Sequence, residues 1–162
     1  MLDARETLDH VTFRAGTVED GDKLVGHYRA FFAFSDLPGL GLAFSDENMG
    51  QWVRRVISTG AAPHILALDR HAGGIVGSID YFIDRNIAAQ PFANLDKLFV
   101  LPEWRLSAIG RVLLSLAMQD AKAAGCVAFR AGLSAGASYS KNLFHRLGFD
   151  ETPSSVLMAR RL

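Results

Sequence analysis

The segment 98–114 constrains the fold more than any other part of the chain. An apolar run that ends at Val100 is followed by a proline-containing turn, a loop of small residues and an apolar repeat of helical spacing that begins near Ile109. Arg105 and Arg111 stand at the two ends of the loop. The first N–H groups of a helix have no partner within it, and together with the helix dipole they attract phosphate. The sequence therefore predicts a strand, a loop and a helix that bind a phosphate-bearing cofactor.

Strand-like and helix-like patterns alternate along the rest of the chain. The strands we expect are 11–14, 64–68, 75–83, 92–100, 126–133 and 156–159, and the helices we expect are 18–34, 46–59, 109–124 and 138–147. This order predicts an α/β fold in which helices pack on a central mixed β-sheet. Because the 162 residues contain neither a repeat nor a linker, we expect a single domain over residues 1–162.

The composition argues against several classes of partner. The 17 basic residues balance the 17 acidic ones, whereas proteins that bind nucleic acid through its phosphates carry a basic excess. No apolar run approaches the roughly 20 residues that cross a membrane, and residues 1–10 lack a signal-peptide pattern. Cys126 is the only cysteine, and the 5 histidines have no metal-ligand spacing. We therefore expect a cytoplasmic protein that binds no nucleic acid, no membrane and no metal.

Two motifs lie about forty residues apart in the second half of the chain. The first is Arg105-Leu106-Ser107-Ala108-Ile109-Gly110, and the second is the segment 142–149, which ends in Gly-Phe. In this order they resemble the GNAT superfamily of acetyl-CoA-dependent N-acetyltransferases, whose loop has the form Arg/Gln-x-x-Gly-x-Gly/Ala and whose closing helix ends in Gly-Phe. The resemblance extends over residues 11–162, and the central strand and loop are similar to those of diamine-acetyltransferase-like members.

The resemblance implies an activity and a position for the cofactor. Members of the superfamily transfer an acetyl group from acetyl-CoA to a primary amine by direct attack in a ternary complex, and many form homodimers. They separate two strands beside the loop, so that the pantetheine arm pairs with freed backbone groups while the diphosphate lies over the loop amides. The cofactor-binding residues this implies are Leu98, Phe99, Val100, Arg105, Leu106, Ser107, Ala108, Ile109, Gly110, Arg111 and Phe144. The alternative is an ordinary strand–turn–helix whose glycine relaxes the turn.

Four positions depart from the common pattern of the superfamily. Leu106 and Ala108 stand where glycines are usual, and a methyl group at Ala108 restricts φ and narrows the approach to the diphosphate. Ala137 stands where an asparagine often meets the cofactor. Phe144 stands where many members carry the tyrosine that protonates the departing thiolate. These departures suggest an alternative function, in which an impaired GNAT-fold module binds acyl-CoA or a protein partner without turnover.

The transfer to an amine requires a base, since an alkylammonium with a pKa of about 10.4 is neutral in only about one molecule per thousand at pH 7. Asp96 is the candidate, because a regular strand would put its side chain on one face with Leu98 and Val100, where burial would raise its pKa. The alternative is a surface carboxylate paired with Lys97. Backbone amides near Phe99 and Val100 would stabilise the oxyanion.

Other residues are candidates for the remaining roles at the site. Tyr139, on the closing helix, is a candidate for the missing phenol. Asp80 and Asp84 are expected to face the cleft and attract a cationic acceptor, unless they are ordinary solvated strand residues. Phe34 and the loop 35–45 are expected to line the acceptor site, with packing or a dimer contact as the alternative.

Overall fold

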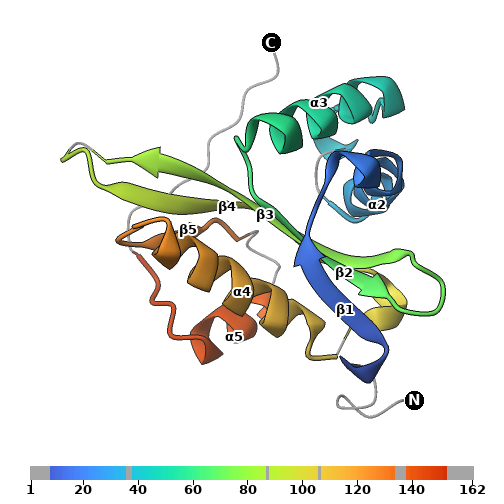
Figure 1. Ribbon diagram of the computed structural model, residues 1–162. Helices are drawn as coiled ribbons and strands as arrows, with labels where there is room; N and C mark the ends of the chain where they lie inside the picture. Colours follow the sequence, from blue (N-terminus) through green and yellow to red (C-terminus); the bar gives the residue numbers. More distant parts are fainter. Residues whose placement is uncertain (1–7, 36–37, 87, 106, 134–137, 153–162) are drawn as a thin grey trace.

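A twisted five-stranded sheet runs through the centre of the protein, which was examined as a computed structural model that describes residues 8–35, 38–86, 88–105, 107–133 and 138–152 (Figure 1). The strands are β1 (Val11–Ala15), β2 (His64–Asp69), β3 (Ile75–Arg85), β4 (Pro91–Val100) and β5 (Phe129–Ala131). They lie side by side in sequence order, antiparallel from β1 to β4 and parallel between β4 and β5. The mixed sheet predicted from the sequence is confirmed.

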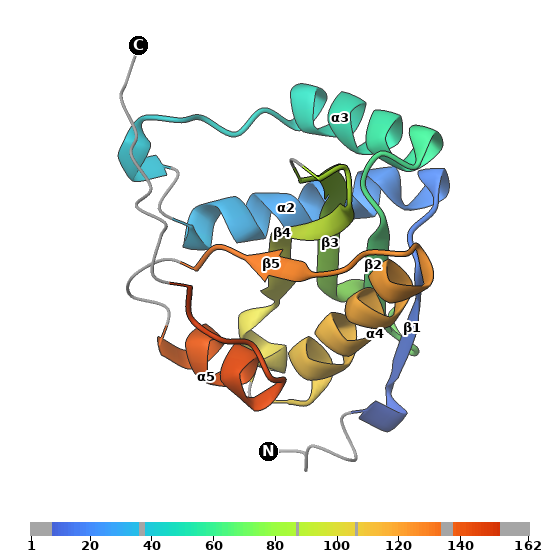
Figure 2. The ribbon, with the colours of Figure 1, turned by 90° about the vertical axis from the view of Figure 1, so that its left-hand side faces the viewer.

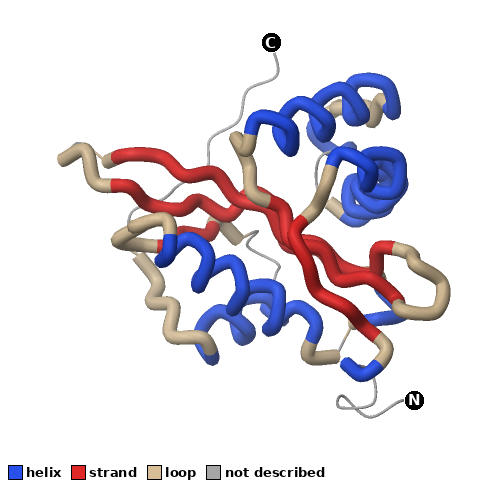
Figure 3. The backbone as a smooth tube through the Cα atoms, viewed as in Figure 1, coloured by secondary structure: helices blue, strands red, loops and turns tan. Residues whose placement is uncertain are grey.

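Helices cover both faces of this sheet (Figures 1 and 3). The helices are α2 (Gly21–Phe34), α3 (Asp46–Thr59), α4 (Ile109–Ala123) and α5 (Ser138–Arg146), and the short 3-10 turns are η1 (Val18–Asp20), η2 (Pro38–Leu40) and η3 (Pro102–Trp104). The pair α2 and α3 lies on one face, and the pair α4 and α5 lies on the other, as the view at right angles also shows (Figure 2). The sheet therefore has one pair of helices on each of its faces.

Local capping explains why α3 begins and ends where the sequence predicts. The side chain of Ser45 accepts a hydrogen bond from the backbone N–H of Asn48 at 3.3 Å and so caps the first turn. Gly60 follows the last turn with a φ of 65°, a left-handed conformation that favours glycine. The other expected helix of this layer, 18–34, begins as the 3-10 turn η1 and continues as α2. The Asp20 carboxylate accepts a hydrogen bond from Thr17 N–H at 2.8 Å and so caps the first turn.

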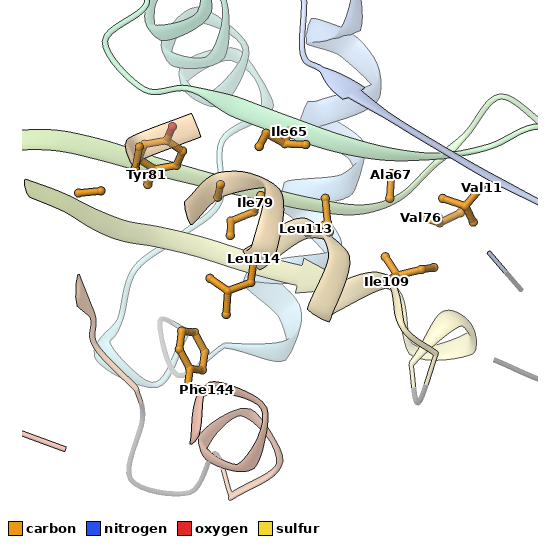
Figure 4. Close-up of a cluster of buried hydrophobic side chains, with 13 residues drawn as sticks. Val11, Ile65, Ala67, Val76, Ile79, Tyr81, Ile109, Leu113, Leu114 and Phe144 are labelled. Carbon is orange, nitrogen blue, oxygen red and sulfur yellow. The ribbon is translucent and has the colours of Figure 1, made fainter. Parts of the chain in front are cut away.

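The layer between the sheet and α4 is an apolar core (Figure 4). Ile109, Leu113 and Leu114 of α4 are fully buried against β3 and β4, and burying one such side chain contributes about 1.5–3 kcal/mol. The approach of α4 to the sheet is close at Gly77, where a Cβ would lie 3.1 Å from Ile109 and 3.2 Å from Leu113. This packing positions the N-terminus of α4 at the end of β4.

Two expected strands differ from the observed ones. The strand expected over 126–133 is only three residues long, Phe129–Ala131. The strand expected over 156–159 lies outside the described residues. The shortness of β5 matters for the site, because among the described residues it leaves much of β4 without a strand partner on that side.

Candidate active site

The strand β4 has a partner along only part of one edge. On β3 its partners run from Arg85 to Gly77, which covers the whole strand apart from one irregularity. On β5 they cover only 93–95. From Asp96 to Val100 the outer edge of β4 therefore has no strand partner within the described residues, and its backbone groups need hydrogen bonds from elsewhere. The strand separation predicted beside Leu98, Phe99 and Val100 would lie along this stretch of β4.

The loop that follows β4 leads directly into α4. Ser107 Oγ donates to the carbonyl of Trp104 at 2.6 Å and accepts from Ile109 N–H at 3.3 Å, which holds the turn in front of the helix. Ala108 is the N-cap, and its side chain makes no hydrogen bond to the first turn. Its φ is −76°, a value that any residue adopts, so the missing glycine causes no backbone strain at this position. Leu106 lies outside the described residues.

The two arginines of the loop are not equivalent. Arg105 turns back toward β4, where its Nε donates to the carbonyl of Val100 at 3.0 Å. Its guanidinium lies 4.9 Å from the ring centre of Phe34 and 5.4 Å from that of Phe99. Arg111, in the first turn of α4, is exposed. The arginine charge at the helix N-terminus therefore comes from Arg111, while Arg105 covers the aromatic end of β4.

Asp96 does not share a face with Leu98 and Val100, so the expectation based on a regular strand is wrong. The pairing of β3 with β4 passes from Asp80–Lys97 directly to Tyr81–Leu95, which makes Asp96 the extra residue of a β-bulge. Leu98 and Val100 pack against the core under α4, whereas the Asp96 carboxylate contacts the Lys97 ammonium on the other face. Its side chain is 37% exposed rather than buried, and it is paired with Lys97, as the alternative interpretation proposed.

Asp80 is the buried carboxyl of the site. It is 0% exposed, and it accepts hydrogen bonds from the Tyr28 hydroxyl at 3.1 Å and from Lys97 Nζ at 3.0 Å. Burial raises the pKa of Asp80 to about 7, with Lys97 opposing the rise and Asp96 adding to it. The interpretation of Asp80 as a solvated residue is therefore wrong.

The other predicted acceptor-site residues lie apart from this carboxyl. Asp84 is exposed and accepts a hydrogen bond from the N–H of Arg85, so it does not join the same group. Phe34 lies at the end of α2, 61% exposed, with its ring centre 6.1 Å from that of Phe99. The structure thus brings Phe34 to the end of β4, near Arg105, and leaves Asp84 at the surface.

The sequence interpretation missed several residues around Asp80. His64, Asp80 and Lys97 form a row across β2, β3 and β4. The Lys97 ammonium lies 4.6 Å from the ring centre of Trp52 on α3 and 5.3 Å from that of Tyr28 on α2. Burial lowers the pKa of His64, whose Nδ1 donates to the carbonyl of Ala62. The sequence does place a carboxylate and a lysine on neighbouring predicted strands, which was the available signal for this group. Whether the two residues meet depends on the register of the strands, which the bulge sets.

The closing helix supplies no visible acid at the position where the superfamily has its tyrosine. Phe144 is 4% exposed and packs edge-on against Phe149, with 4.9 Å between ring centres. It lies among the core residues near Leu114, where little of its surface remains for a cofactor (Figure 4). Tyr139 belongs to α5, but its side chain is not among those described, and Ala137 lies outside the described residues.

Comparison with known proteins shows the family of the chain. Residues 38–149 match the acetyltransferase (GNAT) family. The chain belongs to this family. The curated proteins contain no significant match. The GNAT fold of the chain is also found in solved structures of low sequence identity, so these show a common fold.

Three of these structures illustrate the similarity. A probable acetyltransferase is 17% identical, with a TM-score of 0.79 and coverage of 93% of this chain and 99% of that one. An aminoglycoside acetyltransferase from an uncultured soil metagenomic sample, in complex with sisomicin, is 16% identical, with a TM-score of 0.79 and coverage of 97% and 99%. Glucosamine-6-phosphate N-acetyltransferase from Arabidopsis thaliana is 15% identical, with a TM-score of 0.73 and coverage of 93% and 97%.

Two further features of this GNAT domain concern metal-binding groups and membrane-spanning helices. Among the described residues, no three side chains of His, Cys, Asp or Glu gather into a metal-binding group. None of the helices in the described part of the chain is long and apolar enough to span a membrane.

Proposed function

We propose that this GNAT domain is an N-acetyltransferase that uses acetyl-CoA and acetylates a primary amine of a small molecule. The observation that carries the proposal is the outer edge of β4 from Asp96 to Val100, which has no strand partner among the described residues and leads directly into the N-terminus of α4. A pantetheine arm needs backbone hydrogen bonds along its length and a diphosphate needs N–H donors at its end. These two neighbouring features offer both.

The amine acceptor approaches β4 from the face of α2 and α3 in this proposal. Its nitrogen attacks the thioester carbonyl carbon, the new amide bond forms, and the carbon–sulfur bond breaks. Asp96, at the bulge of β4, takes the proton that the ammonium loses, directly or through water. Backbone N–H groups near Phe99 and Val100 are the candidate donors to the oxyanion. As the amide forms, the nitrogen releases its second proton to water. Since Phe144 has no hydroxyl, the thiolate leaves without help from that position and takes a proton from water, as its pKa near 8.5 permits.

Two observations favour a small-molecule acceptor. The Lys97 ammonium is surrounded by two carboxylates and an aromatic ring, a charged group of the size of a single alkylamine rather than of a peptide chain. Two of the structurally similar acetyltransferases are named for amino sugar substrates, an aminoglycoside in one case and glucosamine-6-phosphate in the other.

The cofactor assignment is tested by thermal unfolding with and without acetyl-CoA. Acetyl-CoA at about a hundred times its dissociation constant should add about 2.7 kcal/mol to the free energy of unfolding, which raises Tm by several degrees. Release of free CoA thiol in the presence of a panel of amines then tests the reaction. A protein whose Tm does not respond to millimolar acetyl-CoA would contradict the proposal.

The burial of Phe144 favours one second candidate, a module that binds acyl-CoA without turnover. This module would give the same increase in Tm with acetyl-CoA, since the outer edge of β4 and the N-terminus of α4 are unaffected. It would release no thiol with any amine at any pH. The two candidates therefore differ in the thiol assay and agree in the binding assay.

A further inference from the structure

The residues around Asp80 form a charged group whose role the proposed reaction does not explain. We call Tyr28, Asp80, Asp96 and Lys97 the Asp80 cluster. Removing a carboxylate from water costs several kcal/mol, and a buried ion pair often contributes little net stability compared with apolar side chains of the same volume. Stability alone therefore does not account for a fully buried Asp80 paired with Lys97.

The side chain of Lys97 shows what kind of group this cluster binds. Its ammonium has two carboxylate partners, Asp80 at 3.0 Å and Asp96, and it lies against the rings of Trp52 and Tyr28 at 4.6 and 5.3 Å. Carboxylates combined with aromatic faces are the usual surroundings of a bound alkylammonium group. An acceptor amine in its charged form is also an alkylammonium, and Asp96 is exposed enough, at 37%, to meet it.

The net charge of the cluster depends on one proton. Lys97 contributes one positive charge and Asp96 one negative charge, so the sum is zero when Asp80 is protonated and −1 when Asp80 is ionised. The neighbouring groups do not alter this sum near neutral pH. Burial raises the pKa of Tyr28 well above its usual value and lowers that of His64, and Trp52 does not titrate. Asp80, whose pKa is raised to about 7, therefore changes the charge of the cluster near neutrality.

We propose that the Asp80 cluster is the ammonium-binding part of the acceptor site and that Asp80, acting through Lys97, provides the net negative charge that draws a cationic alkylamine to Asp96. This inference rests on the proposed acetyltransferase function and adds a substrate class to it. Asp80 is a positioning residue here, because it is fully buried and reaches the acceptor only through its contact with the Lys97 ammonium. Cationic alkylamines should be preferred over amines that are uncharged at pH 7.

The test compares two amines and two Asp→Asn substitutions, one in the cluster and one at the surface. The probes are n-butylamine, a cation at pH 7, and aniline, which is uncharged. Asp80→Asn should raise the KM for n-butylamine about tenfold at pH 8, the effect expected from losing one nearby charge in a partly screened site. The KM values for aniline and acetyl-CoA should stay within about twofold of the wild-type values.

The controls separate a charge effect from damage to the fold. Asp22→Asn removes the same charge from an almost fully exposed position on α2 and should change no KM value. A structural defect in Asp80→Asn would raise the KM values for n-butylamine and aniline alike, whereas the proposal requires a change for n-butylamine alone. An equal change for aniline, or an unchanged KM for n-butylamine, would overturn it.

A binding measurement keeps this inference independent of turnover. The chain has 2 tryptophans, so Trp104→Phe leaves Trp52 as the only one, beside the cluster. Quenching of Trp52 fluorescence by n-butylamine should strengthen as the pH rises from 6 to 8 and should lose this pH dependence in Asp80→Asn. If wild-type protein releases no thiol but quenches in this way, the proposed reaction fails and the ammonium site stands. If it turns over without this pH dependence, the ammonium site fails.

Discussion

The two faces of the sheet bury side chains of different kinds. On the face covered by α4, the buried residues are apolar and surround Ile109, Leu113 and Leu114. On the face covered by α2 and α3, Asp80 and His64 are buried with Tyr28, and the His64 Nε2 and Ser78 Oγ atoms have no hydrogen-bond partner within the described residues. The second face also holds an apolar cluster around Leu24, Val53 and Leu66, so both faces contribute to folding. Since buried polar groups cost free energy, their presence on the second face alone indicates that this face carries the chemistry.

The largest effect should come from Asp96→Asn on the polar face. If Asp96 is the base, this variant should lower kcat by about 10²–10⁴-fold, because an amide cannot take the proton of the acceptor. Its Tm and its affinity for acetyl-CoA should stay close to those of the wild type, since Asp96 is 37% exposed and outside the loop. Steady-state kinetics and thermal unfolding measure the two quantities. An unaltered pH–rate profile would remove Asp96 as the base.

Leu113→Ala, on the apolar face, should lower stability. Leu113 is 0% exposed, so the substitution should lower the free energy of unfolding by about 2–5 kcal/mol through lost burial and a cavity. Urea denaturation measures the change. The matched control is Ile83→Ala, at a side chain that is 41% exposed, which should cost far less. Equal losses for the two variants would contradict the assignment of this face as the main core.

Gly77→Ala tests how closely α4 must approach the sheet. The new Cβ would meet Ile109 at 3.1 Å and Leu113 at 3.2 Å, and relief of this overlap should cost about 1–3 kcal/mol. Gly26→Ala is the control, because no atom lies within 4 Å of the added Cβ in α2 and a helical alanine should stabilise the protein by up to about 1 kcal/mol. Denaturation curves of both variants give the comparison, and a stabilised Gly77→Ala protein would show that α4 can move outward freely.

The effect of Asp80→Asn should appear as a pH dependence of stability. The pKa of Asp80 is raised to about 7 in the folded protein, so its contribution to stability is fully present below its unfolded pKa of about 3.9 and is lost as the pH rises through 7. The difference in unfolding free energy should therefore shift in favour of the variant between about pH 4 and pH 7.

The comparison with wild type removes the effects of other groups. Burial lowers the pKa of His27 to about 4, which makes both proteins less stable as the pH falls from about 6.5, and this cancels in the difference. Denaturation of both proteins at a series of pH values measures the shift. A difference that does not change with pH would mean that Asp80 titrates normally.

Much of the fold could be predicted because it depends on local signals. The helix predicted over 46–59 has those bounds in the structure, since Ser45 and Gly60 define its ends through contacts within a few residues. The apolar repeat after Ile109 predicted α4 for a similar reason, because one face of a helix must be apolar to pack on a sheet. The order of these elements was enough for the mixed sheet.

The candidate site was predicted less completely, because its side chains meet through strand pairing. Asp96 was assigned to the face of Leu98 and Val100 on the assumption of strict alternation, which the bulge breaks. Asp80 and Lys97 are 17 residues apart in the chain and meet only in one register of β3 and β4. Arg105 was assigned to the phosphate loop, but its side chain turns back onto Val100.

The sequence by itself determined the order of the elements, the mixed sheet and membership of the GNAT family, since these depend on short-range patterns of apolar residues, caps and loop motifs. Only the tertiary structure decided which carboxyl is buried, that both Asp80 and Asp96 meet Lys97, and where β4 has no strand partner among the described residues. The physical reason is that a side chain in a strand has two faces to choose from, and a single extra residue in the pairing changes the choice.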